Sequence, residues 1–581
     1  MTSSEQANYL MCAAIDLGTT YSGYTFSSRH DFTRDPTKSA IKQWIDPITT
    51  MTSQKTSTCI LFTNEKQFAN FGFEAEEKYM ELTLDKEQRD WYLFRRFKMS
   101  LYAIRSSHDE VLVEDVDGKT LPALLVFSES IRYLKDSLIL ECKNQNTDIQ
   151  LNDIRWVLTV PAIWSDPAKT FMRTAAEKAG ISSEKLTIAL EPEAAAIFVK
   201  YLPVDRKVDG ELGETFKTFS KGSKYIVVDA GGGTIDITAH EVLENGKVKE
   251  ILKASGGDWG GTKVDENYID FVENIVGENV MRKIKREKRS LLYEISREFE
   301  IAKRALKPGS TSKVNVRVPS ELSDIYESVY RGKSLRKITT VELPGGKSVK
   351  ISFMGDKLRL ESSTAESFFV QSIRHILDHM SSLFKTKDGK DISTILLVGG
   401  YAESPMLVHA VRERFPEKRI IIPQEAAWSV LRGAVIFGHD SSLIKERISK
   451  YTYGIKVQEN FNPEIHDEKH KVEKGGKIMC KYLFSKHVTI DETITVGEYQ
   501  SNKGYSTYDG NFYVEVFTST KTNPKYIDED DCSSIGKISF HYEDHGHKGD
   551  IRVQMMFSDT EIEVNVILVG TKKNKKLYLK Q

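Results

Sequence analysis

Two glycine turns constrain this sequence more than any other feature. In the second of them, the apolar run 225–228 ends at Asp229, and the turn 230–234 contains three consecutive glycines and a threonine. The pattern predicts a strand, a tight turn and another strand. Glycines permit positive φ and let backbone amides approach a ligand, so the turn is suited to an anion. Taken alone, it is as typical of a β-bulge or a structural hairpin.

The same pattern occurs near the N-terminus, and the pair is more specific than either turn. Residues 11–15 are apolar, Asp16 follows, and the turn 17–20 carries a glycine and two threonines. A repeat of this kind predicts two related α/β lobes whose hairpins face each other across a cleft. An acidic residue before each turn and hydroxyls within it indicate a phosphate that arrives with a divalent metal.

Composition and charge exclude several other classes of protein. A chain of 581 residues is too long for one hydrophobic core, and a formal net charge of -1 gives no general attraction to nucleic acid or an anionic membrane. The five scattered cysteines lack the spacing of a zinc site or a disulfide framework, which favours a reducing compartment. The N-terminal region has no basic segment, and its apolar run is too short to span a bilayer. We therefore predict no membrane span and a cytoplasmic location, with the nucleus as a second compartment.

The helical run 295–307 places four charged residues on one face, at i, i+3, i+4 and i+7. These residues are Glu300, Lys303, Arg304 and Lys307. A surface ion pair between Glu300 and Arg304 is the simpler interpretation. The functional interpretation is a polar wall that clasps a ribose and adenine.

Two glycine pairs add further candidates. A buried strand at 392–398 ends at Gly399 and Gly400, just before a predicted helix, where a ligand rim can form. Another glycine-dense turn ends in Gly260 and Gly261.

From residue 451 onward, helical periodicity disappears. Short alternating or β-branched runs separated by turn residues predict a separate all-β module. The basic run 281–289, earlier in the chain, lacks interleaved aromatic residues, so it predicts a solvated helix and not a nucleic-acid surface.

Taken in order, these motifs resemble those of the superfamily of actin, sugar kinases and heat-shock protein 70 ATPases, and within it the divergent 12A/12B-like branch of the heat-shock protein 70 family. The resemblance covers about residues 11–440 and is carried by the segments 15–22, 159–162, 191–192 and 228–236. It implies an α/β fold of two actin-like (ribonuclease H-like) lobes around a nucleotide cleft, followed by a small all-β C-terminal module. The implied boundaries are about 11–200 and 224–440 for the lobes, 441–450 for a linker and 451–570 for the module.

The resemblance also implies ATP or ADP with Mg2+ as cofactors, and it gives the motif residues roles. It assigns metal binding, largely through the water shell of the ion, to Asp16, Glu191 and Asp229. It assigns catalysis to Lys98, Glu191, Asp229 and Thr234. It assigns nucleotide binding to Gly18, Thr19, Thr20, Tyr21, Gly231, Gly232, Gly233, Thr234, Gly260, Gly261, Glu300, Lys303, Arg304, Lys307, Gly399, Gly400 and Tyr401.

The sequence departs from the family pattern in three places. The segment 94–98 stands where the family has Ala-Lys-Arg-Leu, which makes Lys98 the candidate for the lysine that stabilises the attacking water, in a register open to a shift of one residue. The adenine rim has Glu403 close to where the family has an arginine. The linker at 441–450 is not acidic and leucine-rich, and no helical lid follows, so coupling to J-domain co-chaperones is not carried over.

We therefore predict an ATP-binding protein of the heat-shock protein 70 type with slow Mg2+-dependent ATP hydrolysis, which presents a lidless β-rich module to protein clients or binding partners. A nucleotide-gated scaffold that binds ATP without useful turnover is the first alternative. A metabolite kinase of the same superfamily is the second, and it is disfavoured because such kinases do not need the β tail. No binding to nucleic acid is predicted.

Overall fold

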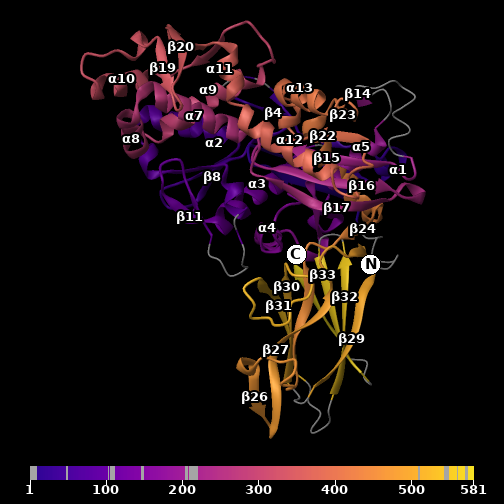
Figure 1. The fold of residues 1–581 in the computed structure, drawn as a ribbon. Coiled ribbons are helices and arrows are strands. Elements are labelled where there is room, and N and C mark those ends of the chain that lie inside the picture. The colour runs from indigo at the N-terminus through magenta and orange to yellow at the C-terminus, as the bar shows by residue number, and fades with distance from the viewer. Residues whose placement is uncertain are drawn as a thin grey trace.

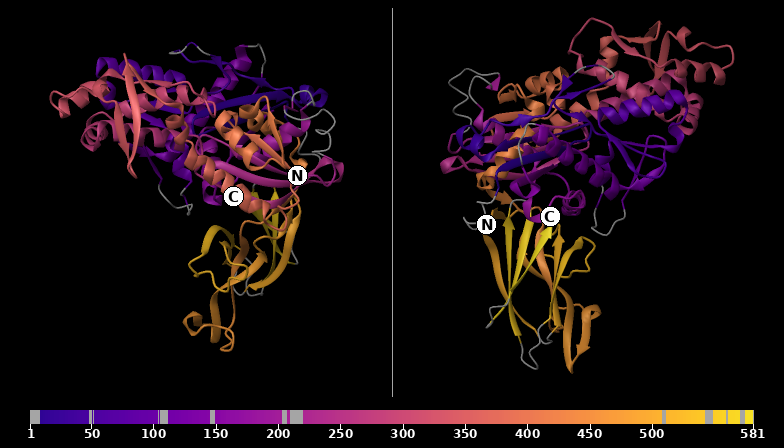
Figure 2. Two further views of the ribbon diagram at one scale, coloured as in Figure 1. Left: turned by 45° about the horizontal axis from the view of Figure 1, so that its top comes forward. Right: turned by 180° about the vertical axis from the view of Figure 1, so that it is seen from behind.

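The fold separates an α/β body from a C-terminal region built of strands (Figure 1). The computed structural model describes residues 9–47, 50, 52–102, 104, 111–144, 149–202, 207–208, 220–507, 511–541, 549–558, 561–569 and 574–580. Within these residues, no helix is long and apolar enough to cross a membrane. Both views in Figure 2 show the strand-built region extending from one side of the body.

The N-terminal half of the body is built on a six-stranded sheet. In it, β1 (Met11–Leu17) and β2 (Tyr21–Ser28) form an antiparallel hairpin around the first glycine turn. Parallel strands β12 (Ile154–Val160) and β13 (Leu186–Leu190) extend the sheet from β1. All residues of β1 and β12 are buried, as expected of strands covered on both faces. The predicted strand, turn and strand are confirmed here.

The second glycine turn occupies the equivalent position in an eight-stranded sheet. There, β15 (Lys224–Ala230) and β16 (Ile235–Val242) form the hairpin, and β22 (Thr394–Val398) and β23 (Arg419–Pro423) add parallel strands from β15. On the other side, β17 (Val248–Gly257) pairs with β16. A hairpin followed by two parallel strands is therefore common to both sheets, as an internal repeat requires.

Two helices join the sheets through one hydrophobic cluster. It contains Ala14 of β1 and Val227 of β15 together with residues of α5 (Glu191–Tyr201) and α14 (Ser429–His439). The backbones of the two helices are in contact where the helices cross. A Cβ added to Gly433 would lie only 1.6 Å from the carbonyl oxygen of Ala194. Only glycine fits at this crossing.

Replacing Gly433 by alanine should destabilise the body, because the added methyl group overlaps the Ala194 carbonyl and forces α5 and α14 apart. Overpacking of this kind typically destabilises by about 1–3 kcal/mol. Thermal unfolding of the full chain, followed by circular dichroism, measures the loss. Gly504→Ala is the matched control, since a Cβ there meets nothing closer than 3.9 Å. Equal Tm values for Gly433→Ala and the wild type would contradict the close crossing.

The helix with the polar face, α9 (Ser290–Arg304), ends earlier than the side-chain spacing predicts. Its C-cap is Ala305, so Lys307 lies beyond the helix. Pro308 follows, and a residue that precedes proline is disfavoured in the α conformation. The prediction that Lys307 continues the helical face is therefore wrong.

Residues 441–450, expected as a linker, take part in the folded body. After η11 (Ser441–Leu443), the strand β24 (Ile444–Ile448) pairs in parallel with β17 and antiparallel with β28 (Thr493–Thr495). Arg447 donates two hydrogen bonds to Glu193, at 3.0 and 2.6 Å. The eight-stranded sheet thus continues into the C-terminal region without a break.

The C-terminal region consists of two sheets with a shared core that includes Val516, Val553 and Val564. Among its described residues, the one helical element is the three-residue η12 (Glu468–His470). The first sheet contains β25 (Thr452–Asn460), β26 (Lys471–Lys474), β27 (Lys477–Val488), β30 (Asn511–Ser519) and β31 (Cys532–His541). The second contains β29 (Tyr499–Thr507), β32 (Gly549–Ser558), β33 (Glu561–Leu568) and β34 (Asn574–Lys580).

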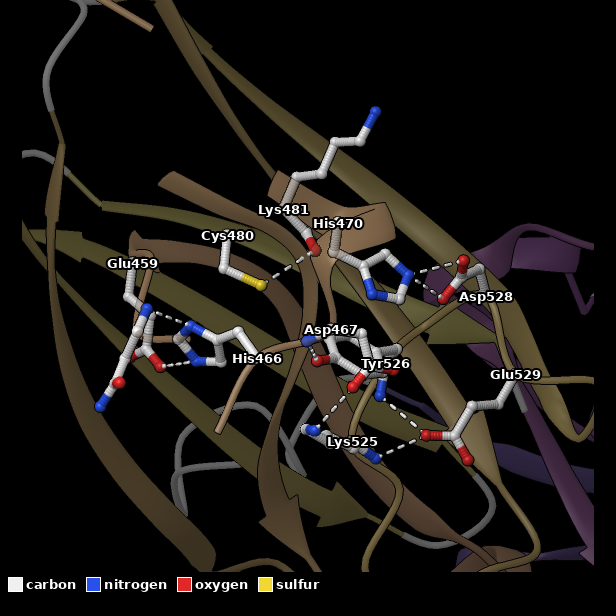
Figure 3. Close-up of polar contacts among 11 residues, drawn as sticks. Glu459, His466, Asp467, His470, Cys480, Lys481, Lys525, Tyr526, Asp528 and Glu529 are labelled. Atoms are coloured by element: carbon white, nitrogen blue, oxygen red, sulfur yellow. Dashed lines mark hydrogen bonds and ion pairs between the residues drawn. The ribbon is translucent and has the colours of Figure 1, made fainter. Parts of the chain in front are cut away.

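Polar pairs tie the loops around β26 and β27 together (Figure 3). His470 Nε2 lies 2.9 Å from Asp528 Oδ2, and the His470 ring stacks on Tyr526 with centroids 3.8 Å apart. His466 Nε2 lies 3.0 Å from Glu459 Oε1. Three or more His, Cys, Asp or Glu residues do not converge into a metal site anywhere in the described ranges. These pairs connect the segment 466–470 to β25 and to the loop 526–528.

Candidate functional site

The two glycine turns line one cleft of about 370 Å³, a volume within the range of small-molecule sites. Of the residues predicted from the sequence, Gly260 and Lys307 are not part of its lining, and all the others are. Those in the lining are Asp16, Gly18, Thr19, Thr20, Tyr21, Lys98, Glu191, Asp229, Gly231, Gly232, Gly233, Thr234, Gly261, Glu300, Lys303, Arg304, Gly399, Gly400 and Tyr401.

The two turns touch each other. A Cβ at Gly232 would lie 2.5 Å from Thr20 Oγ1, and one at Gly233 would lie 2.6 Å from Thr19 Oγ1. Side chains larger than hydrogen therefore do not fit on the second turn. The hydroxyls of the first turn stand directly against the backbone of the second, so both turns can contact one small anionic group.

The backbone just before α7 (Thr262–Val276) holds the second turn in place. The backbone N–H groups of Gly260, Gly261 and Thr262 donate to the carbonyls of Gly233, Gly231 and Gly232 at 3.1, 3.2 and 2.8 Å. Gly260 therefore supports the turn through its backbone, although it does not line the cleft.

Four buried carboxylates interact with one another beside the turns: Asp16, Glu191 and Asp229, which line the cleft, and Asp236, which does not. Two lysines pair with two of them. Lys55 Nζ lies 2.6 Å from Asp16 Oδ2, and Lys98 Nζ lies 2.7 Å from Glu191 Oε1. The cleft thus holds more acidic groups than basic partners, which suits a bound cation.

The pKa values of the carboxyl groups follow from this imbalance. Burial, together with the neighbouring carboxylates, raises the pKa of Asp229 well above its usual value. Burial also raises the pKa of Glu191 to about 7, although Lys98 opposes the shift. For Asp16, burial is outweighed by Lys55 and Lys98, and the pKa is lowered. An added cation would therefore stabilise the ionised form of Asp229.

Lys98 is distinguished from its basic neighbours by position. It lies in η3 (Phe97–Leu101) and points into the cleft, with Nζ 5.4 Å from the ring centroid of Trp164. The guanidinium of Arg95 instead stacks over a ring of α9, and Arg96 pairs with Asp265 at 2.6 Å. Among these three basic residues, Lys98 alone contributes to the lining of the cleft.

The charged face of α9 closes the opposite side of the cleft. Glu300 Oε1 accepts hydrogen bonds from Tyr21 OH at 3.1 Å and from Arg304 Nη2 at 2.7 Å. Burial raises the pKa of Glu300, but Lys303 and Arg304 outweigh it and lower the value to about 2. Lys303 Nζ donates to the carbonyl of Gly261 at 3.1 Å. Glu300 and Arg304 thus form the predicted ion pair and also line the cleft.

The rim after β22 carries an aromatic side chain and a carboxylate. Tyr401 OH lies 3.2 Å from Ser372 Oγ, and its ring stacks on Phe369 with centroids 6.5 Å apart. Glu403 Oε1 accepts a hydrogen bond from the backbone N–H of Ala427 at 3.2 Å. Both Tyr401 and Glu403 are therefore held against the rim by neighbouring residues.

Comparison with known proteins identifies the family. Heat shock 70 kDa protein 12A of Mus musculus is 32% identical over 99% of this chain and 92% of its own length. The chain belongs to the heat-shock protein 70 family. Heat shock 70 kDa protein 12B of Homo sapiens is 30% identical over 98% of the chain and 91% of its own length. Chaperone protein DnaK of Thermosipho melanesiensis is 26% identical over 52% of the chain and 45% of its own length, and the family model "Hsp70 protein" matches residues 95–337.

Membership of the heat-shock protein 70 family indicates an ATP-binding protein, and the cleft fits a nucleotide with Mg2+. Both glycine turns line the cleft, together with the carboxylates of Asp16, Glu191 and Asp229. Within the described residues, no three His, Cys, Asp or Glu side chains converge closely enough to ligate a metal directly. The carboxylates of Asp16, Glu191 and Asp229 offer oxygen ligands of the kind that Mg2+ takes, and this ion usually keeps several of its waters.

Among the lining residues that the sequence analysis did not identify, Lys55 and Trp428 have the side chains most relevant to an anionic ligand. Lys55 lies between β5 (Thr52–Ser53) and β6 (Thr56–Ser57), and Trp428 lies in η10 (Ala426–Trp428). Neither belongs to a glycine motif or to a regular spacing. Strand pairing and the packing that follows β23 bring them to the cleft, and such long-range effects leave no local signal.

Neutralising Asp229 should stabilise the nucleotide-free protein at alkaline pH. Because its pKa is raised by folding, the folded chain retains a proton that the unfolded chain releases, so the stability of the wild type falls as pH rises above the unfolded value. Asp229→Asn removes this effect, and we expect a gain on the order of 1 kcal/mol at about pH 8 that vanishes at about pH 4.

Thermal unfolding without nucleotide at both pH values measures the difference. Asp388→Asn, at an exposed position, is the control that should show no such pH dependence. A lower Tm for Asp229→Asn than for the wild type at the higher pH would contradict the assignment of Asp229 as an uncompensated buried acid.

Proposed function

We propose that this chain is a slow, Mg2+-dependent ATPase of the heat-shock protein 70 type, with two actin-like lobes around the cleft. Its C-terminal region, built of strands with no helical lid among its described residues, presents a surface to protein clients or binding partners in the cytoplasm. The observation that carries the proposal is the contact between the two glycine turns beside four buried carboxylates. A polyphosphate between the turns is held from both sides.

The residues of the chain perform hydrolysis mainly by positioning. Bound Mg2+ supplies charge neutralisation at the phosphates. The backbone of Gly232 and Gly233 and the hydroxyl of Thr234 hold the terminal phosphate. Lys98, fixed by Glu191 at 2.7 Å, orients the attacking water. Glu191, whose pKa burial raises to about 7, accepts a proton near neutral pH.

Removing Lys98 should slow single-turnover ATP hydrolysis. Lys98→Ala leaves the water without its cationic partner, and we expect a loss on the order of 100-fold, as for other preorganised charged donors. Asp229→Ala should slow the reaction as well. Lys143→Ala, on the exposed end of α3 (Ala123–Asn144), is the control. Intact ATP binding with hydrolysis insensitive to both substitutions would contradict the ATPase and favour a scaffold that binds ATP without turnover.

A nucleotide-gated scaffold is the second candidate, and a chain of hydrogen bonds favours it. Asp236 Oδ1 accepts from the backbone N–H of Ile163 at 2.8 Å. The adjacent carbonyl of Ala162 accepts from Lys450 Nζ, at the start of the C-terminal region. This segment follows Pro161, which by resemblance to the family would correspond to its interdomain switch proline. A change beside the phosphates can reach the C-terminal region by this route.

Coupling of this kind should make protease cutting within residues 441–450 differ between the ATP and ADP states. Lys450→Met removes the bond to Ala162 and should make the two cutting patterns alike. Limited proteolysis with mass spectrometry of the fragments measures both effects. Lys469→Met, beside β26 at the far end of the C-terminal region, is the control and should preserve the difference. Equal cutting of the wild type in both states would contradict coupling but leave the ATPase standing.

A further inference from the structure

Lys55 is a cation of the cleft that the proposed hydrolysis does not use. It lines the same cleft as the two glycine turns, and its side chain is 13% exposed. Its Nζ lies 2.6 Å from Asp16 Oδ2, the carboxylate at the end of β1. A lysine is seldom buried this far without a partner, so Lys55 belongs to the wall of the cleft and not to the solvated surface.

Three neighbouring elements hold Lys55 in this position. The adjacent strand β6 pairs with β2, which fixes the backbone beside Lys55. The β2 residue Gly23 makes room for the side chain, since a Cβ there would lie 3.2 Å from Lys55 Cγ. The ammonium also lies 5.5 Å from the ring centroid of Trp428, within cation–π distance. The ammonium group is thus directed along the cleft wall toward Asp16.

Lys55 pairs with Asp16 and still has N–H donors for a second acceptor. The second oxygen of Asp16 accepts a hydrogen bond from Thr159 at 3.0 Å. The two other lysines that line the cleft, Lys98 and Lys303, are paired with Glu191 and Asp265. An ammonium group has three N–H donors, and the bond to Asp16 uses one. The others can serve an anionic ligand beside the first turn.

We propose that Lys55 is a built-in counter-ion of the phosphate site, which bonds Asp16 and a phosphate oxygen of the nucleotide and so reduces the dependence of nucleotide binding on a divalent cation. The inference deepens the proposed function and rests on it. Lysine binds phosphate as a point charge, and this one is supplied by the fold. The effect applies to ADP and ATP and not to adenosine, which has no phosphate.

Calorimetric titration of the full chain with ADP and with adenosine, in Mg2+ and in EDTA, tests the proposal. In EDTA, Lys55→Met should weaken ADP binding about tenfold or more, in keeping with the loss of a charged hydrogen bond. In Mg2+ the loss should be smaller, because the ion shares the phosphate charge. Adenosine binding should not change. Lys55→Arg should restore most of the ADP affinity in EDTA, and Lys253→Met, half-exposed and paired with Asp491, is the matched control.

The outcomes separate this inference from the proposed function. A wild type that binds neither ADP nor ATP overturns both. A wild type that binds ADP, with Lys55→Met binding equally well in EDTA, overturns the inference alone. An equal loss of ADP and adenosine also overturns it, because the loss is then one of structure. Circular dichroism and Tm values of Lys55→Met and Lys55→Arg verify that both variants are folded.

Discussion

Four interacting carboxylates buried in one region are the constraint on which the rest of the structure depends. Asp16 and Asp229 lie near the ends of the first strands of two hairpins, so the two sheets must meet at these ends to bring them together. Buried charges without partners destabilise the folded state, as the raised pKa of Asp229 indicates. The tight crossing of α5 and α14 holds the sheets together against this repulsion. The folded body is therefore predisposed to bind a cation and the anion that accompanies it.

Local sequence patterns predicted the elements that form within one segment. Both hairpins and the buried strand β22 follow from apolar runs and turn residues, which are short-range signals. The prediction that Lys307 lies on the helix was wrong, because the effect of Pro308 overrides a side-chain spacing that is typical of a helix. The place of β24 depends on pairing with β17 and β28, which lie far from it in sequence. No periodicity within residues 441–450 contains that information.

The same distinction applies to the site. The glycine turns and the acidic residues before them could be predicted, because each motif is contiguous. Lys98 was named from the sequence in a register open to a shift of one residue. The structure brings Lys98, and neither Arg95 nor Arg96, to the lining of the cleft, because Arg96 adopts a left-handed φ of 53° just before η3 and the chain turns there. Lys55 does not belong to any sequence motif. Its role depends on the pairing of β6 with β2, a contact between segments that no spacing rule connects.

The first turn of α5 links the cleft to the C-terminal region. Glu191 pairs with Lys98 in the cleft, and Glu193, two residues later, pairs with Arg447 of β24. Both carboxylates are buried, so separating either from its partner would leave an uncompensated charge. Pro192 lies between them and fixes φ, which makes the turn stiff. In the scaffold proposed above, a movement that adjusts Glu191 to a ligand would be transmitted through this turn to the Arg447 contact, and thermodynamic reciprocity would then require a change at β24 to alter affinity in the cleft.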